Sequence, residues 1–123
     1  MDKMMVRADV VKNRLYLTLV GFFSDEEMKQ GSDQVIEFIN KLKPGFNIIN
    51  DISKFKPATP KGAEELKRAQ QAAVEAGVRR TIRVIGSEGI AQMQFARKGK
   101  ESGLEADVAA SVEDAEKMLD DEV

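Results

Sequence analysis

The sequence predicts a single α/β domain over residues 1–123, with a mixed, mostly parallel sheet of five strands and four helices. Two short segments rich in β-branched and aliphatic residues come first, and predicted helices then alternate with predicted strands. The later strands start at residues 15, 47, 81 and 106, a spacing typical of successive βαβ crossovers. Because such crossovers make neighbouring strands parallel, we expect the order β-β-α-β-α-β-α-β-α with one antiparallel strand at the start.

The first two strands, at residues 6–11 and 15–20, are predicted to form an antiparallel hairpin. In the second strand, leucines at positions 15, 17 and 19 alternate with other residues at the period of a strand. Asn13 lies in the connection, and asparagine tolerates a positive φ. The connection is therefore expected to be tight.

A capping-box pattern, Ser24 with Glu27, predicts the start of a helix that reaches about Lys43. Phe23 and Met28 occupy the positions of a hydrophobic staple around this cap. Gly31 is expected to weaken the helix by about 1 kcal/mol relative to alanine, or to kink it. The apolar stripe predicted to face the sheet consists of Met28, Val35, Ile36, Ile39 and Leu42.

The next two helices follow predicted strands at residues 46–52 and 81–85. Thr59 is the expected N-cap of the second helix, with Pro60 at its first position and Gly77 at its end. Its predicted buried side consists of Leu66, Ala69, Ala73 and Ala76. In the third helix, residues 90–100, the side chains predicted to face inward are Ile90, Met93 and either Phe95 or Ala96.

The carboxyl-terminal part is predicted to contain a weak strand at residues 106–110 and a last helix capped by Ser111. Its predicted inward side chains are Val112, Ala115, Met118 and Leu119. Residues 101–123 carry a net charge of −8, whereas residues 54–100 carry +7. We expect the acidic end to fold back toward the basic middle and to reduce its positive field.

The composition excludes several classes of chemistry. The chain has no Cys and no His, which excludes disulfides, Cys/His zinc sites, thiol nucleophiles and imidazole triads. No spacing typical of metal ligands is recognisable. Because Cys and His are also missing, we expect no catalytic residue, metal or cofactor. The basic residues are scattered and the pI is 5.3, which argues against nucleic-acid binding.

The expected location is the cytoplasm. No apolar leader is visible at the start, and the longest uncharged apolar stretch, residues 15–24, is too short to cross a membrane. We therefore expect no integral membrane segment. Exposed edge strands would permit a homodimer.

Candidate binding residues follow the carboxyl ends of the parallel strands, where open α/β sheets collect their ligands. The loop before the second helix offers Phe55 as an aromatic anchor, with Lys54, Lys56 and Lys61 as a charged rim. The helix start at Thr59 could hold an anion. Ser53, Gly62 and Ser87 complete the set of predicted binding residues.

The order of elements and residues 51–66 resemble the sulfate-transporter and anti-sigma-factor-antagonist (STAS) domain, in its SpoIIAA-like branch. The central strand of that family typically ends Asp-Leu-Ser, here Asp51-Ile52-Ser53. The family then places Asp-Ser-Ser-Gly at the start of the second helix, which aligns with Thr59-Pro60-Lys61-Gly62. Gly62 matches, but Pro60 and Lys61 replace the serines, one of which accepts phosphate in the anti-sigma antagonists. The resemblance therefore implies the scaffold without that phosphorylation switch.

Two functions are open at this point. The first is a non-catalytic regulatory module that resembles an anti-sigma factor antagonist and recognises a protein partner through the loop around Phe55. The second is a carrier of a small apolar ligand or lipid, of the Sec14-like type, with a pocket between helix and sheet lined by Phe22, Met93 and Phe95. An enzyme using Asp51, Ser53, Lys61 or Glu88 would need a strongly shifted carboxylate or lysine.

Overall fold

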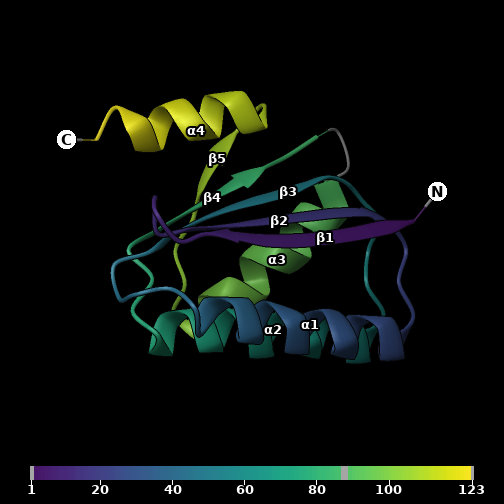
Figure 1. Ribbon diagram of the computed structural model, residues 1–123. Coiled ribbons are helices and arrows are strands. Elements are labelled where there is room, and N and C mark those ends of the chain that lie inside the picture. Colours follow the sequence, from purple (N-terminus) through teal and green to yellow (C-terminus); the bar gives the residue numbers. More distant parts are fainter. Residues whose placement is uncertain (1, 87–88, 123) are drawn as a thin grey trace.

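The computed structural model describes residues 2–86 and 89–122 as a five-stranded sheet with three helices on one face and one on the other (Figure 1). The strands are β1 (Lys3–Asp9), β2 (Arg14–Gly21), β3 (Asn47–Phe55), β4 (Arg80–Val84) and β5 (Asp107–Ala109). The helices are α1 (Asp25–Ile39), α2 (Pro60–Glu75), α3 (Gly89–Ser102) and α4 (Val112–Asp120). The α/β class and the order of elements predicted from the sequence are confirmed.

The strands lie in the sheet in the same order as in the chain, from β1 to β5. β1 is antiparallel to β2, and each later pair is parallel. Successive right-handed crossovers that move in one direction across a sheet leave their helices on one face. This is the face that α1, α2 and α3 cover, and α4 packs on the other (Figure 1).

The local signals predicted from the sequence are present at the expected residues. Asn13 has a φ of 55° in the hairpin connection. Ser24 and Glu27 form a complete capping box at the start of α1. Thr59 accepts the amide of Gly62 at the start of α2, and Ser111 caps α4. These turns and caps fix where the helices begin.

The core lies in three clusters on the two faces of the sheet. Two of them, centred on Phe55 and on Phe46, fill the space between the sheet and α1–α3. The third joins Tyr16, Ile49 and Ile82 to α4 through Ala115 and Leu119. The two faces therefore have separate cores.

Two expectations for the helices need correction. α1 ends at Ile39 rather than near Lys43, and it continues through Gly31 without a break. A Cβ at Gly31 would collide with the Met4 side chain, so this glycine allows β1 and α1 to approach closely. In α3 the predicted inward side chains Ile90 and Met93 are 67% and 59% exposed. Ala96 is also exposed.

The inward face of α3 consists instead of Ala91, Phe95 and Gly99, which lie four residues apart. Small residues before and after Phe95 let α3 approach the sheet and α2 closely. The sequence prediction followed the largest apolar side chains, whereas packing selects the face with the smaller residues.

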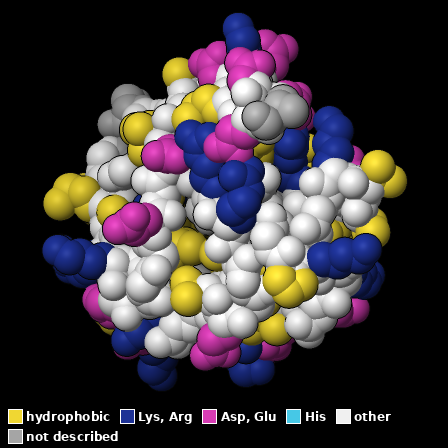
Figure 2. Space-filling model, turned by 90° about the vertical axis from the view of Figure 1, so that its left-hand side faces the viewer, with side chains coloured by type: hydrophobic (Ala, Val, Ile, Leu, Met, Phe, Trp, Pro, Cys, Tyr) yellow, Lys and Arg dark blue, Asp and Glu magenta, His cyan; other side chains and the backbone are white. Residues whose placement is uncertain are grey.

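The acidic carboxyl terminus folds back as expected. Glu122 pairs with Arg79 and Arg80, and Asp107 also pairs with Arg80. Figure 2 shows Lys and Arg side chains next to Asp and Glu side chains on this side of the molecule. In residues 2–86 and 89–122, no helix is both long and apolar enough to cross a bilayer, and no acidic cluster suited to a metal ion is found.

Candidate ligand-binding site

The predicted binding loop does not form the surface that the sequence suggested. Phe55 is fully buried, in contact with Phe23 and Phe95 at ring-centroid distances of 6.1 and 5.6 Å. The expectation that Phe55 anchors a partner from the surface is therefore wrong. Lys54 and Lys56, which flank Phe55 in the sequence, are exposed, but the Phe55 ring does not reach the surface.

A β-bulge explains the burial of Phe55. Between the pairs Thr18–Asp51 and Val20–Lys54, β3 advances by three residues while β2 advances by two. The extra residue reverses the alternation of side chains along the rest of the strand. Phe55 is consequently turned toward the helix-covered face, and the strand extends past the predicted end at residue 52.

The start of α2 is already satisfied by the chain's own groups. The Thr59 hydroxyl accepts the Gly62 amide at 3.0 Å and donates to the carboxylate of Asp25. Because Asp25 already places a negative charge beside this helix end, the end is a poor site for the anion expected from the sequence. Lys61 is exposed at the same end.

The remaining predicted site residues have structural contacts or fall outside the described part. The Ser53 hydroxyl donates to Asp51 at 2.6 Å, and its amide donates to the same oxygen. Gly62 is buried close to the Met28 side chain. Ser87 and Glu88 lie outside the described residues, so the predictions that involve them stay untested.

A cavity of about 60 Å³ lies between the sheet and the α1–α2 pair. Roughly 10–15 Å³ on the same measure is enough for one water molecule, so this space is several times larger. On α1 its lining extends from Met28 to Ile39, about 16 Å along the helix axis. A small volume spread over that length is a narrow slot.

The lining of the slot is mainly apolar and includes a few buried polar side chains. β2 contributes Leu15, Leu17 and Leu19, and α1 contributes Met28, Val35 and Ile39. The lining also includes Asn50 of β3, Thr81 and Arg83 of β4 and Gln70 of α2, all less than 9% exposed. Each of these four polar side chains has a buried atom with no hydrogen-bond partner in the described part of the chain: Asn50 Oδ1, Gln70 Oε1, Thr81 Oγ1 and Arg83 Nε.

Arg83 is the most unusual of these groups because it is 4% exposed and carries a charge. Its Nη2 donates to the carbonyl of Phe95 at 3.2 Å, and Gln70 Nε2 donates to the same oxygen at 3.1 Å. Within residues 2–86 and 89–122, no carboxylate lies within ion-pair distance of this guanidinium. Loss of hydration lowers the pKa of Arg83 from its ordinary value. An arginine nevertheless stays protonated at neutral pH.

Gly99 of α3 makes room for this guanidinium. A Cβ at Gly99 would lie 2.6 Å from Arg83 Nη2 and 3.1 Å from the carbonyl oxygen of Leu104. The guanidinium is thus held against the α3 backbone by a neutral contact.

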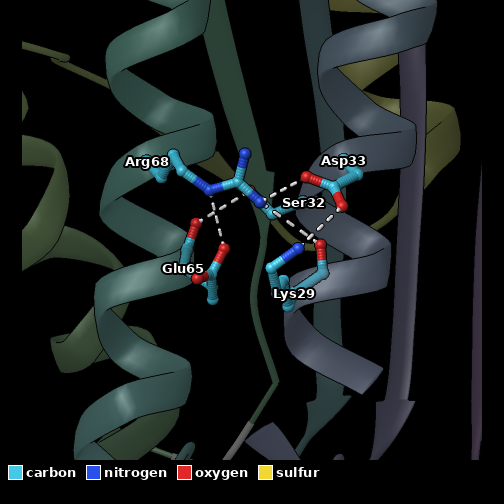
Figure 3. A network of polar contacts seen from close by, with 5 residues as sticks. All are labelled: Lys29, Ser32, Asp33, Glu65 and Arg68. Carbon is cyan, nitrogen blue, oxygen red and sulfur yellow. Dashed lines mark hydrogen bonds and ion pairs between the residues drawn. The ribbon is translucent and has the colours of Figure 1, made fainter. Parts of the chain in front are cut away.

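A polar network joins α1 to α2 beside the cavity (Figure 3). Arg68 of α2 reaches Asp33 of α1 at 2.6 Å and Glu65 at 2.8 Å. The Ser32 hydroxyl donates to the Glu65 carbonyl at 3.2 Å, and both residues line the cavity. The hydrogen bond from Arg68 lowers the pKa of Asp33. This network ties the two helices together where they border the slot.

The pocket residues expected from the sequence are corrected in part. Phe95 lines the cavity, but Phe22 and Met93 are exposed and do not. The sequence reasoning missed Arg83, Asn50 and Thr81. Their position in the sequence could have indicated them. Strands that helices cover on both faces are usually apolar at every position, so a polar residue next to Ile49, Ile82 or Val84 is unusual.

Comparisons with known proteins support the fold. No protein-family model matches the chain, and no curated protein matches it in sequence. Among solved structures, it is similar to an uncharacterised protein of the DUF3478 family from Shewanella loihica PV-4, which has a SpoIIAA-like fold. The two chains are 14% identical, with a TM-score of 0.69 over 97% of this chain and 95% of that one. The chain therefore has a SpoIIAA-like fold, as the sequence resemblance implied.

Proposed function

We propose that this SpoIIAA-like domain is a non-catalytic binding module that holds a small, largely apolar molecule between the sheet and the α1–α2 pair. The cavity of about 60 Å³ carries the proposal. Protein cores are close-packed, so a space of this size among aliphatic side chains is an exception. Pockets with mainly apolar walls and a few polar groups are typical of small-molecule sites.

The non-catalytic part of the proposal rests on the residues available. The chain has no His and no Cys. The carboxylate that lines the cavity, Glu65, is engaged by Arg68. Asp51 is bonded to Ser53, and neither residue lines the cavity.

The cavity favours a ligand-binding role over the partner-binding role. The partner surface depended on Phe55 as an exposed anchor, and this side chain is buried. The lysines at 54, 56 and 61 remain exposed, so recognition of a protein partner stays a prediction, as do a regulatory role, a cytoplasmic location and self-association.

Methyl NMR with 1-hexanol as a neutral apolar probe tests the binding function. We expect the methyl signals of Leu15, Leu17 and Val35 to shift on titration, because these side chains line the cavity. Ala73→Leu fills the cavity and should abolish these shifts. Ala72→Leu makes the same change at a residue of α2 that does not line the cavity, and it should leave them intact. Unshifted methyls in the wild type, or equal binding by both variants, would refute the proposal.

A further inference from the structure

The buried charge in the lining of the slot restricts what can occupy it. Arg83 is a buried cation without a carboxylate partner among the described residues, and burial of an unpaired charge is strongly unfavourable. Among residues 2–86 and 89–122, its Nε has no hydrogen-bond partner, and its Nη2 donates to the neutral carbonyl of Phe95. A bound anion would remove the imbalance.

The surroundings of Arg83 favour a single negative charge. The polar side chains that line the cavity are neutral apart from Arg83 and Glu65, and Glu65 is paired with Arg68. A dianion would leave one charge without a partner in this site. A carboxylate is a monoanion at neutral pH, and its two oxygens fit the planar donor fork of arginine.

The apolar part of the lining restricts the rest of the ligand. Its leucines and the α1 side chains Val35 and Ile39 offer no hydrogen bonds, and the space is long and narrow. An unbranched apolar chain fits this shape better than a ring or a charged group does.

We infer that the ligand is a monocarboxylic acid with a short unbranched apolar chain, whose carboxylate pairs with Arg83. This inference rests on the proposed binding function and adds the chemical class of the ligand. The buried hydroxyl of Thr81, two residues before Arg83 on β4, lines the same cavity and is a second donor for the carboxylate. The chain lies along β2 and α1.

Hexanoate and 1-hexanol, compared at pH 7, test this inference because they share a chain and differ in charge. We expect the wild type to bind hexanoate about 10- to 100-fold more tightly than hexanol, as for a charge-assisted hydrogen bond. Hexanoate should also shift the ¹⁵Nε–¹Hε signal of Arg83, and hexanol should not.

Two variants locate the effect. Arg83→Met should remove the preference for hexanoate while retaining hexanol binding. Arg97→Met removes the same charge from the exposed surface of α3 and should leave the preference unchanged. Arg83→Lys keeps the charge without the planar fork and should give an intermediate preference, which serves as the readout where Arg83→Met fails to fold.

The outcomes separate the two proposals. Equal binding of both probes to the wild-type cavity would overturn the carboxylate inference and leave the binding function standing. Hexanoate binding without a shift of the Arg83 signal would also overturn it. If neither probe shifts the methyl signals of the cavity residues, both proposals fail.

Discussion

Two arginines of this chain are buried to the same extent, on opposite sides of the sheet, and differ in their partners. Arg14 is 6% exposed and Arg83 is 4% exposed. Arg14 lies 3.3 Å from Glu116 and 3.1 Å from Asp120, both on α4. Arg83 pairs with no carboxylate within the described residues, and it interacts with the carbonyl and the ring of Phe95.

The difference in partners appears in the pKa of each group. Desolvation lowers the pKa of Arg14, but hydrogen bonds to Tyr16 and Asp120 outweigh it and raise the pKa overall. Desolvation alone acts on Arg83 and lowers its pKa. The Nε of both side chains has no hydrogen-bond partner among the described residues. The two arginines therefore differ in whether a carboxylate lies beside the charge. We therefore expect Arg14 to stabilise the docking of α4 and Arg83 to lower the stability of the protein without a bound anion.

The largest expected effect is stabilisation by Arg83→Met. The change replaces an uncompensated charge by an apolar side chain of similar length, and we expect the free energy of unfolding to rise by about 1–4 kcal/mol. Urea unfolding of the ligand-free protein measures it, with Arg97→Met as the exposed control. A loss of stability on Arg83→Met would show that the guanidinium is compensated after all.

Arg14→Met should have the opposite sign. It removes the partner of Glu116 and Asp120, and we expect a loss of about 1–2 kcal/mol, less than for a fully buried pair because both carboxylates remain partly exposed. The same urea experiment measures it. Changes of equal sign in the two variants would contradict the comparison.

The smallest effect concerns an exposed pair, Arg68 with Asp33. The hydrogen bond from Arg68 lowers the pKa of Asp33 below its ordinary value of 3.8. The stability from the ionised carboxylate is therefore present above this value and is lost as the pH falls through the lowered pKa. We expect Asp33→Asn to be slightly less stable than the wild type at pH 7.

Urea midpoints at pH 7 and pH 3 test the behaviour of Asp33, and the difference should shrink at pH 3. Glu37→Gln, on the exposed side of α1, is the matched control and should show no such change with pH. A pH-independent difference for Asp33→Asn would indicate that packing rather than charge is responsible.

The parts of the fold that depend on neighbouring residues could be predicted from the sequence. The cap at Ser24, the turn at Asn13 and the helix start at Thr59 each depend on interactions within four residues. The parallel direction of the later strands was predicted from the spacing of their starts, because a βαβ crossover returns the chain to the same edge of the sheet.

The candidate site could not be predicted, because it depends on how distant elements pack. The bulge that buries Phe55 is a property of the β2–β3 register, which depends on a partner strand more than 25 residues away in the sequence. The inward face of α3 is selected by Gly99, whose missing Cβ admits Arg83. The cavity exists because α1, α2 and the sheet meet without filling the space between them.

The sequential arrangement of the strands bears on how the chain assembles. Each strand from β2 onward is added beside the strand that precedes it in the chain. Every neighbouring pair is consequently closed by one connection, and no strand must be inserted between two others. Loop-closure entropy grows with the length of chain enclosed. The sheet can therefore grow outward from the hairpin as the polypeptide leaves the ribosome, with β5 and α4 as the last elements to join.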